Sequence, residues 1–228
     1  MSFTENLRHE NDDLFQKIFN HSFVKGIGNG DVPSEAVKHY IKADFEYLNS
    51  FIKVYALAIV KSSRRSDFQF FNEQISFILN DETHPHHNFC QYANVDYKSL
   101  QHHPLPPTAD HYIKHMLFHA QNGTLAEIYS ALLPCPWTYY EIALNLIEHF
   151  NINEEHPFYE WISFYDRDDL KDLILNLRKR LDSLASLANE NEKINIREAF
   201  RKSCELELKF WDMAYTCENW SGSSEVSL

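Results

Sequence analysis

The chain has 228 residues, of which 44% are hydrophobic, and its formal net charge is -12. This length suffices for one sizeable core and requires no second domain, and the acidic balance argues against a surface that binds nucleic acid. Four cysteines without disulfide-like spacing, no predicted signal peptide and no apolar run of about 18 residues favour a soluble, cytoplasmic protein without a membrane span.

Apolar residues recur every three to four positions, and only 5 glycines and 8 prolines interrupt the chain. This periodicity predicts one all-α domain over residues 1–220, followed by a polar, disordered tail over 221–228. Residues 21–32 contain three of the five glycines and are predicted to form a loop. The first helix is expected over about 2–20, and a long second helix begins at Pro33. A third helix covers about 66–84, and a short helix continues it to 94. The later helices are expected at about 108–122, from 124 to the prolines at 134 and 136, and at 136–150, 157–166, 168–189 and 192–217.

Residues with strong positional preferences mark several of these boundaries. Pro33 is suited to open the long second helix. Thr108 is expected to cap the helix that follows the proline-rich linker 104–107. Thr124 and Glu127 have the spacing of a capping box for the next helix.

The segment Ala131-Leu-Leu-Pro-Cys135-Pro-Trp-Thr-Tyr139-Tyr places a cysteine between two prolines, at the joint of two apolar helical patterns. Proline lacks an amide proton and clashes with the carbonyl four residues back, so a helix must kink or restart here. A restart at Pro136 would put Cys135 at a helix N-terminus, where the dipole and free amides favour a thiolate. Tyr139 follows one turn later on the same face. Cys135 is therefore either a nucleophile or a small buried core residue.

Asp44 lies in the middle of an apolar stripe of the second helix, one turn from Tyr47. Burying an ionised carboxylate is costly unless it is paired or hydrogen-bonded. Asp44 is thus expected either to bond a tyrosine or a backbone amide in the core, or to accept hydrogen bonds from the amino groups of a substrate.

Glu207 repeats this anomaly on the stripe of the last helix, which includes Cys204 and Trp211. Glu205 lies on the face with Arg201, Lys209 and Asp212, which indicates solvated ion pairs. Periodicity therefore selects Glu207 as the functional candidate. Burial should raise its pKa, as a general acid near neutral pH requires.

A cysteine nucleophile with a buried glutamic acid and a buried aspartate indicates nucleophilic catalysis without a cofactor. A surplus of aromatic residues would suit a flat, apolar-faced ring as substrate. The aromatic candidates for the pocket are Tyr47, Phe51, Tyr112, Trp137, Tyr139 and Tyr165.

Two histidine clusters raise the alternative of a metal site. His111, His115 and His119 recur every four residues but away from the apolar positions, so they are predicted to be exposed rather than to bind a metal. Glu82 and His86 share a helix face only if the helix continues through the intervening proline. They are interpreted as a structural hydrogen-bonded pair, and no metal ligand is assigned.

Taken together, these motifs resemble the TenA/thiaminase II family, whose members are also called aminopyrimidine aminohydrolases. Almost the whole chain is covered, in order. The matching stretches are His21-x-Phe-Val-Lys-Gly-Ile-Gly-Asn-Gly30, Asp44-x-x-Tyr47-Leu48, Tyr112-x-x-His115-Met116, Ala126-Glu127, Ala131-Leu-Leu-Pro-Cys135-x-Trp137-x-Tyr139-Tyr140-Glu141, Trp161-x-x-x-Tyr165 and Glu207-x-x-Phe210-Trp211-x-Met213-Ala214-Tyr215.

The resemblance implies a haem-oxygenase-like helical bundle without haem or another cofactor, and a homotetramer. It also implies hydrolysis of 4-amino-5-aminomethyl-2-methylpyrimidine to the hydroxymethyl compound and ammonia, and cleavage of thiamin, in thiamin salvage. The partner molecules are then a small aminopyrimidine or thiamin. The chain differs from the family pattern at Cys204, where relatives often carry an aromatic residue, and this difference would alter the shape of the pocket.

Carried over residue by residue, the resemblance makes Cys135 the nucleophile and Glu207 the proton donor to the departing amine. Tyr47 would tune the thiol. The remaining implied roles are binding of the aminopyrimidine edge by Asp44 and Tyr139 and lining of the pocket by Tyr112 and Tyr165. In the implied mechanism the thiolate attacks the ring, the protonated substituent leaves, water adds to the resulting methylene, and the cysteine is expelled.

Two other functions are compatible with a helical chain of this kind. A metal-dependent oxidase on the same fold would use the Glu82/His86 cluster with other carboxylates and would not need Cys135. A regulatory protein of secreted-enzyme production would need no turnover, although the acidic charge and the lack of a helix-turn-helix signal argue against direct DNA binding.

Overall fold

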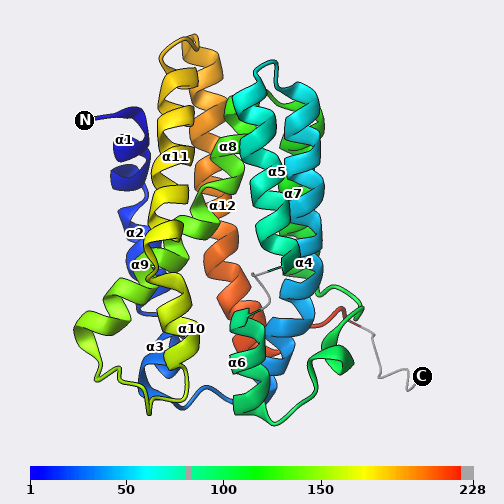
Figure 1. The fold of residues 1–228 in the computed structure, drawn as a ribbon, viewed down its shortest axis with the longest axis vertical. Helices are drawn as coiled ribbons and strands as arrows, with labels where there is room; N and C mark the ends of the chain where they lie inside the picture. Colours follow the sequence, from blue (N-terminus) through cyan, green and yellow to red (C-terminus); the bar gives the residue numbers. More distant parts are fainter. Residues whose placement is uncertain (81–83, 222–228) are drawn as a thin grey trace.

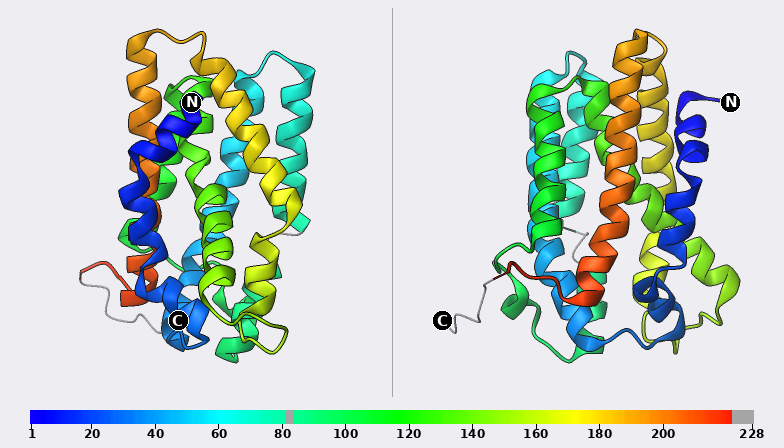
Figure 2. Two further views of the ribbon diagram at one scale, coloured as in Figure 1. Left: turned by 90° about the vertical axis from the view of Figure 1, so that its left-hand side faces the viewer. Right: turned by 180° about the vertical axis from the view of Figure 1, so that it is seen from behind.

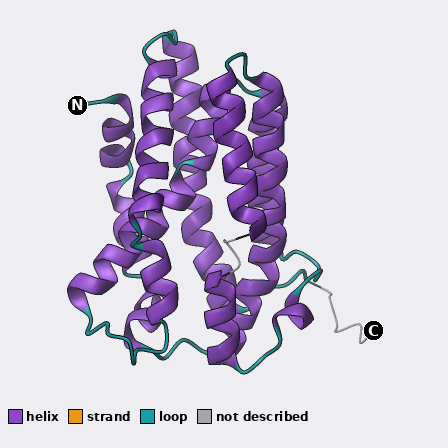
Figure 3. Cartoon of the chain, in the orientation of Figure 1, coloured by secondary structure: helices purple, strands orange, loops and turns teal. Residues whose placement is uncertain are grey.

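Helices form the entire regular structure of residues 1–80 and 84–221, which are the part of the chain that this computed structural model describes (Figure 3). The predicted all-α, single-domain fold is confirmed. The elements are α1 (Phe3–Glu10), α2 (Asp12–Phe19), α3 (Ser22–Asn29), α4 (Ser34–Lys61), α5 (Arg65–Asn80), α6 (His84–Ala93), the 3-10 helix η1 (Tyr97–Leu100), α7 (Pro107–Asn122), α8 (Leu125–Leu132), α9 (Pro134–His149), α10 (Tyr159–Tyr165), α11 (Asp168–Ala185) and α12 (Glu190–Thr216).

The long helices stand roughly parallel (Figure 1), and α12 runs most of the length of the molecule along its rear face (Figure 2). Helix α12 packs against α4, α7, α8 and α9. The short helices α1 and α2 lie along one outer side of this bundle, and α3, α6 and α10 gather at one end (Figure 2). This arrangement gives α4 and α12 two inward faces that meet along the centre of the molecule.

Burial along α4 follows the predicted stripe. Its inward positions include Tyr40, Tyr47, Phe51 and Tyr55, each at most 5% exposed. Apolar burial of this kind stabilises the fold by about 25 cal/mol per Å². Asp44 is buried on the same face, so the core contains a carboxylate that must be explained by its contacts.

The prediction of a loop over residues 21–32 is wrong, because residues 22–29 form helix α3. His21 caps this helix by accepting a hydrogen bond from the backbone N–H of Phe23. Gly28 was assigned to the predicted loop, but it lies within α3, where an added Cβ atom would lie 2.8 Å from the ring of Phe150. Of the three glycines in this segment, only Gly30 has the left-handed conformation (φ 76°) that ends a helix.

Several helix boundaries also differ from expectation. The expected first helix is interrupted at Asn11, which lies between α1 and α2. Thr108 does not cap α7, since Pro106 is the capping residue and the backbone N–H of Thr108 donates to Glu218 Oε2 at 2.9 Å. The capping box of Thr124 and Glu127 is confirmed.

The predicted tail over residues 221–228 lies, apart from its first residue, outside the described part of the chain. Within residues 1–80 and 84–221, no helix is both long and apolar enough to cross a membrane.

Candidate active site

A cavity lies between α4, α5, α9, α10 and α11. It encloses about 560 Å³ of empty space, part of which is open to solvent. Its walls are mostly aromatic and aliphatic, with one carboxylate and one thiol among them. The lining residues are Tyr40, Asp44, Tyr47, Leu48, Phe51, Tyr55, Gln74, Phe77, Ile78, Cys135, Pro136, Tyr139, Tyr165, Leu170 and Leu173.

Cys135 reaches this cavity because the chain kinks between α8 and α9. The new helix begins at Pro134, two residues earlier than predicted. Prolines occupy its first and third positions, where the missing amide protons cost no helical hydrogen bond of α9. The half-buried thiol of Cys135 therefore lies in the first turn of α9, where the helix dipole favours negative charge.

A side chain of α12 supports this kink. Ser203 Oγ donates to the carbonyl oxygen of Ala131 at 2.8 Å. This carbonyl belongs to the last turn of α8, whose acceptors lose intrahelical partners where prolines follow. The bond ties the segment before Cys135 to the helix that carries Glu207.

Glu207 is 2% exposed, and the hydroxyl of Tyr112 donates to its Oε1 at 2.6 Å. Burial raises the pKa of Glu207 to about 8, and the charge of Asp44 adds to this effect, whereas hydrogen bonds with Tyr112 and Cys135 oppose it. Glu207 therefore carries a proton near neutral pH and contacts the cysteine thiol.

Glu205 has the opposite environment. It pairs with Lys202 at 2.8 Å and with Arg201 at 3.4 Å on the outer face of α12. The predicted ion pairing on this face is confirmed for Arg201, while Lys202 takes the place expected for Lys209.

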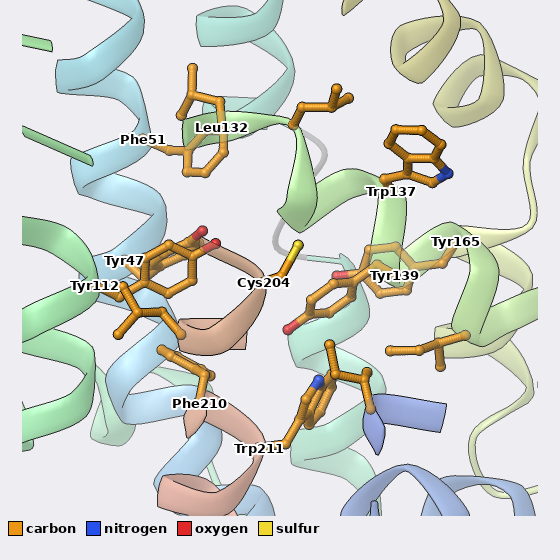
Figure 4. Close-up of a cluster of buried hydrophobic side chains, with 14 of the residues drawn as sticks. Tyr47, Phe51, Tyr112, Leu132, Trp137, Tyr139, Tyr165, Cys204, Phe210 and Trp211 are labelled. Carbon is orange, nitrogen blue, oxygen red and sulfur yellow. The ribbon is translucent and has the colours of Figure 1, made fainter. Parts of the chain in front are cut away.

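Three buried tyrosines, Tyr47, Tyr112 and Tyr139, lie near Cys135 and Glu207. Burial raises the pKa of Tyr47, of Tyr112 and of Tyr139 well above the usual value, so all three phenols remain hydrogen-bond donors. The rings of Tyr47 and Tyr112 lie 5.0 Å apart, on the opposite side of Cys204 from Tyr139 (Figure 4). The Tyr47 hydroxyl is buried without a hydrogen-bond partner of ordinary geometry among the described residues.

Tyr139 is fixed by two other tyrosines. Its hydroxyl lies 2.7 Å from that of Tyr40, and its ring lies 4.9 Å from that of Tyr165. Both Tyr139 and Tyr165 line the cavity, whereas Tyr112 lies behind Glu207 and is not among the lining residues. Five of the seven predicted site residues therefore line the cavity, from α4, α9 and α10. The other two are not lining residues: Glu207 of α12 contacts Cys135, and Tyr112 of α7 contacts Glu207.

Among the described residues, neither a tyrosine nor a backbone amide donates a hydrogen bond to Asp44, so the partner that a purely structural role predicted is not found there. Its Oδ2 accepts a hydrogen bond from Nε2 of His86 at 2.7 Å, and the two residues are 6% and 2% exposed. The predicted partner of His86, Glu82, lies outside the described residues. A carboxylate–histidine pair therefore forms one wall of the site.

Two residues of the site were not identified from the sequence. Tyr40 lies one turn before Asp44 on the same apolar stripe, and this periodicity was the available signal, but its contact with Tyr139 depends on how α4 and α9 are placed in space. The bond of His86 to Asp44 was not predicted, because the two residues lie 42 positions apart in the sequence.

The prediction of an exposed histidine face on α7 is wrong for two of its three residues. His115 Nε2 lies 3.0 Å from Ser203 Oγ, and burial lowers the pKa of His115 to about 4. His119 pairs with Glu127 at 3.1 Å. These rings join α7 to α8 and α12, and only His111 is exposed. Within the described residues, no three His, Cys, Asp or Glu side chains lie together as a metal would require.

Cys204 occupies the centre of the aromatic cluster, on α12 one turn before Glu207 (Figure 4). It is fully buried, and this burial raises the pKa of its thiol well above the usual value. The thiol thus remains protonated and packs as a small apolar group.

Comparison with known proteins supports these observations. The model of the TENA/THI-4/PQQC family matches residues 8–217. The chain is 34% identical over 223 residues to a protein of Staphylococcus saprophyticus named aminopyrimidine aminohydrolase, and the match covers 97% of each chain. A solved TenA homologue from P. horikoshii is 26% identical with a TM-score of 0.82, over 95% of this chain and 99% of that one.

The structure of a haem oxygenase from Leptospira interrogans is similar in fold alone. Its TM-score is 0.55 at 15% identity, over 92% of this chain and 98% of that one. The predicted haem-oxygenase-like fold is therefore confirmed.

Proposed function

Because this chain belongs to the TENA/THI-4/PQQC family, we propose that it is an aminopyrimidine aminohydrolase. It hydrolyses 4-amino-5-aminomethyl-2-methylpyrimidine to the hydroxymethyl compound and ammonia. Thiamin is cleaved by the same chemistry, and the reaction serves thiamin salvage. Staphylococcal relatives that match over nearly their full length bear this name.

The observation that carries this proposal is the contact between Cys135 and Glu207. A thiol in the first turn of a helix meets a glutamic acid that is protonated near neutral pH. Because Glu207 is neutral, it places no negative charge beside a thiolate. The pair supplies both a nucleophile and a proton donor at the wall of one aromatic cavity.

The reaction then follows from this geometry. The Cys135 thiolate adds to a carbon of the pyrimidine ring, and the Glu207 proton passes to the amino group that leaves as ammonia. The resulting exocyclic methylene accepts water, whose proton returns to the Glu207 carboxylate. Expulsion of the Cys135 thiolate restores the aromatic ring, so the enzyme ends the cycle in its original state.

The tyrosines and the carboxylate of Asp44 hold the substrate for this attack. Asp44 accepts a hydrogen bond from the exocyclic amino group of the pyrimidine, and Tyr139 donates to the same edge. Tyr165 provides an aromatic wall, and Tyr47 donates its buried hydroxyl toward the thiolate. Tyr112 holds Glu207 in place.

The test is incubation of the purified protein with the aminomethylpyrimidine, without added metal or cofactor, while ammonia and the hydroxymethyl product are measured together. Equal amounts of both products are expected. A regulatory protein would release neither, and an oxidase would require a metal and an oxidant. Absence of both products, with the protein folded, would refute the proposed activity.

We further propose that the protein acts in the cytoplasm as a homotetramer. The structure contains no disulfide among the four cysteines, all of which lie in the described residues, and this agrees with a reducing compartment. Large apolar side chains on the described surface, such as Val60, Phe118 and Leu187, are more than half exposed and suit contacts between copies. Light scattering of the purified protein measures the assembly directly.

A further inference from the structure

His86 is the most buried histidine among the described residues, at 2% exposed, and the proposed mechanism does not use it. It lies in the first turn of α6, and its ring is held between the rings of Tyr40 and Tyr97, at 6.3 and 5.5 Å. Three elements, α4, α6 and η1, therefore fix its position. We infer that His86 is a positioning residue, which holds the Asp44 carboxylate in the orientation that accepts a hydrogen bond from the amino group of the pyrimidine.

The hydrogen-bond directions follow from the chemistry of the three groups. A carboxylate only accepts, so the hydrogen between His86 and Asp44 belongs to Nε2. In a neutral imidazole the other nitrogen, Nδ1, then accepts, and the hydroxyl of Tyr97 at 3.1 Å is its donor. Tyr97 thereby selects the tautomer that presents a donor to Asp44.

The consequence for ligand binding comes from the two oxygens of Asp44. Its Oδ2 is held by His86, so Oδ1 serves the ligand in the cavity that Asp44 lines. Without the donor at Oδ2, the buried carboxylate would have an unpaired oxygen and would turn toward another donor. Oδ1 would then no longer face the ligand, and the pyrimidine amino group would lose its partner.

This inference rests on the proposed function, and it concerns one feature of the ligand, the amino group on the ring. It predicts that His86 determines how much more tightly the site binds an aminopyrimidine than the same ring without its amino group. A merely structural histidine would affect the binding of both rings equally.

The experiment measures, by calorimetry, dissociation constants for 4-amino-5-hydroxymethyl-2-methylpyrimidine and for 5-hydroxymethyl-2-methylpyrimidine. The wild type is compared with His86→Leu, with His86→Gln, and with His87→Leu as the matched control. His87 is the next residue on α6, is exposed, and contacts the Tyr97 ring at 4.9 Å. Thermal unfolding of each variant shows whether it is folded.

The wild type should prefer the aminated ring, and His86→Leu should lose about ten- to a hundredfold of this preference, the scale of a hydrogen bond to a charged group. His86→Gln, whose amide reaches Asp44 as a donor, should recover most of it, and His87→Leu should keep all of it. An unchanged preference in folded His86→Leu would overturn the inference.

If His86→Leu does not fold, Tyr97→Phe decides, because it removes only the hydroxyl that selects the tautomer. The preference should then fall at least threefold, and no change would overturn the inference. The proposed function fails in a different way, namely if the wild type binds neither pyrimidine.

Discussion

Replacing Glu207 by Gln should make the protein more stable and nearly inactive. The substitution keeps the shape of the side chain and an oxygen that accepts from Tyr112, but it removes the titratable proton. Removal of a general acid typically lowers a rate about a hundred- to ten-thousandfold. We expect ammonia release to fall by such a factor, while binding of the pyrimidine changes little.

The stability change follows from the pKa of about 8, compared with 4.5 for an ordinary glutamate. A carboxyl group whose pKa is raised on folding costs no stability below pH 4.5 and costs progressively more as the pH rises toward 8. Between pH 5 and pH 7 the free energy of unfolding of the wild type should therefore fall by about 2–3 kcal/mol relative to that of Glu207→Gln, since each pKa unit corresponds to about 1.4 kcal/mol.

The assay is urea unfolding of both proteins at pH 5 and pH 7, with ammonia release measured on the same preparations. Glu205→Gln is the control, because Glu205 forms only surface pairs. It should change stability by less than about 1 kcal/mol at either pH and retain activity. A stability difference for Glu207→Gln that does not change with pH would refute the argument from burial, and full activity would refute the assigned role.

Two further substitutions test the binding edge and the packing of α3. Asp44→Ala should weaken binding of the aminopyrimidine, measured by calorimetry, by about 1.5–3 kcal/mol. It should also destabilise the free protein, because His86 loses its acceptor. Asp44→Asn keeps an acceptor for His86, so it should weaken binding while its thermal unfolding stays almost unchanged. Gly28→Ala should cost about 1–3 kcal/mol in urea unfolding, because the new methyl group meets the Phe150 ring at 2.8 Å. Adding Phe150→Leu should recover much of that loss, and a neutral Gly28→Ala would show that the ring moves freely.

The identity of the central side chains could be predicted because their signals are local. A carboxylate on an apolar stripe identified Asp44 and Glu207, and the helical period separated Glu207 from its neighbour Glu205. The two prolines around Cys135 correctly placed the thiol at the start of a helix, although the helix begins at Pro134 and not at Pro136. Each of these arguments depends on residues within one or two turns of one helix.

The contacts between elements could not be predicted in this way. Helical spacing tells which face a residue occupies but not which helix packs against that face, so the bonds of His86 to Asp44 and of Tyr40 to Tyr139 were missed. The glycines of α3 were misinterpreted for the same reason. Gly28 serves a close approach to Phe150, 122 positions along the chain, and no local pattern distinguishes this use from a turn.

The rate of ammonia release by Cys135→Ser, relative to the wild type, tests the central claim most directly. Cys217→Ser is the matched control, since Cys217 is also half-buried but lies at the end of α12, outside the residues that line the cavity. The account predicts no release above background by Cys135→Ser, with unchanged thermal unfolding, and a wild-type rate for Cys217→Ser. Release by Cys135→Ser at a rate close to that of the wild type would contradict nucleophilic catalysis by this cysteine.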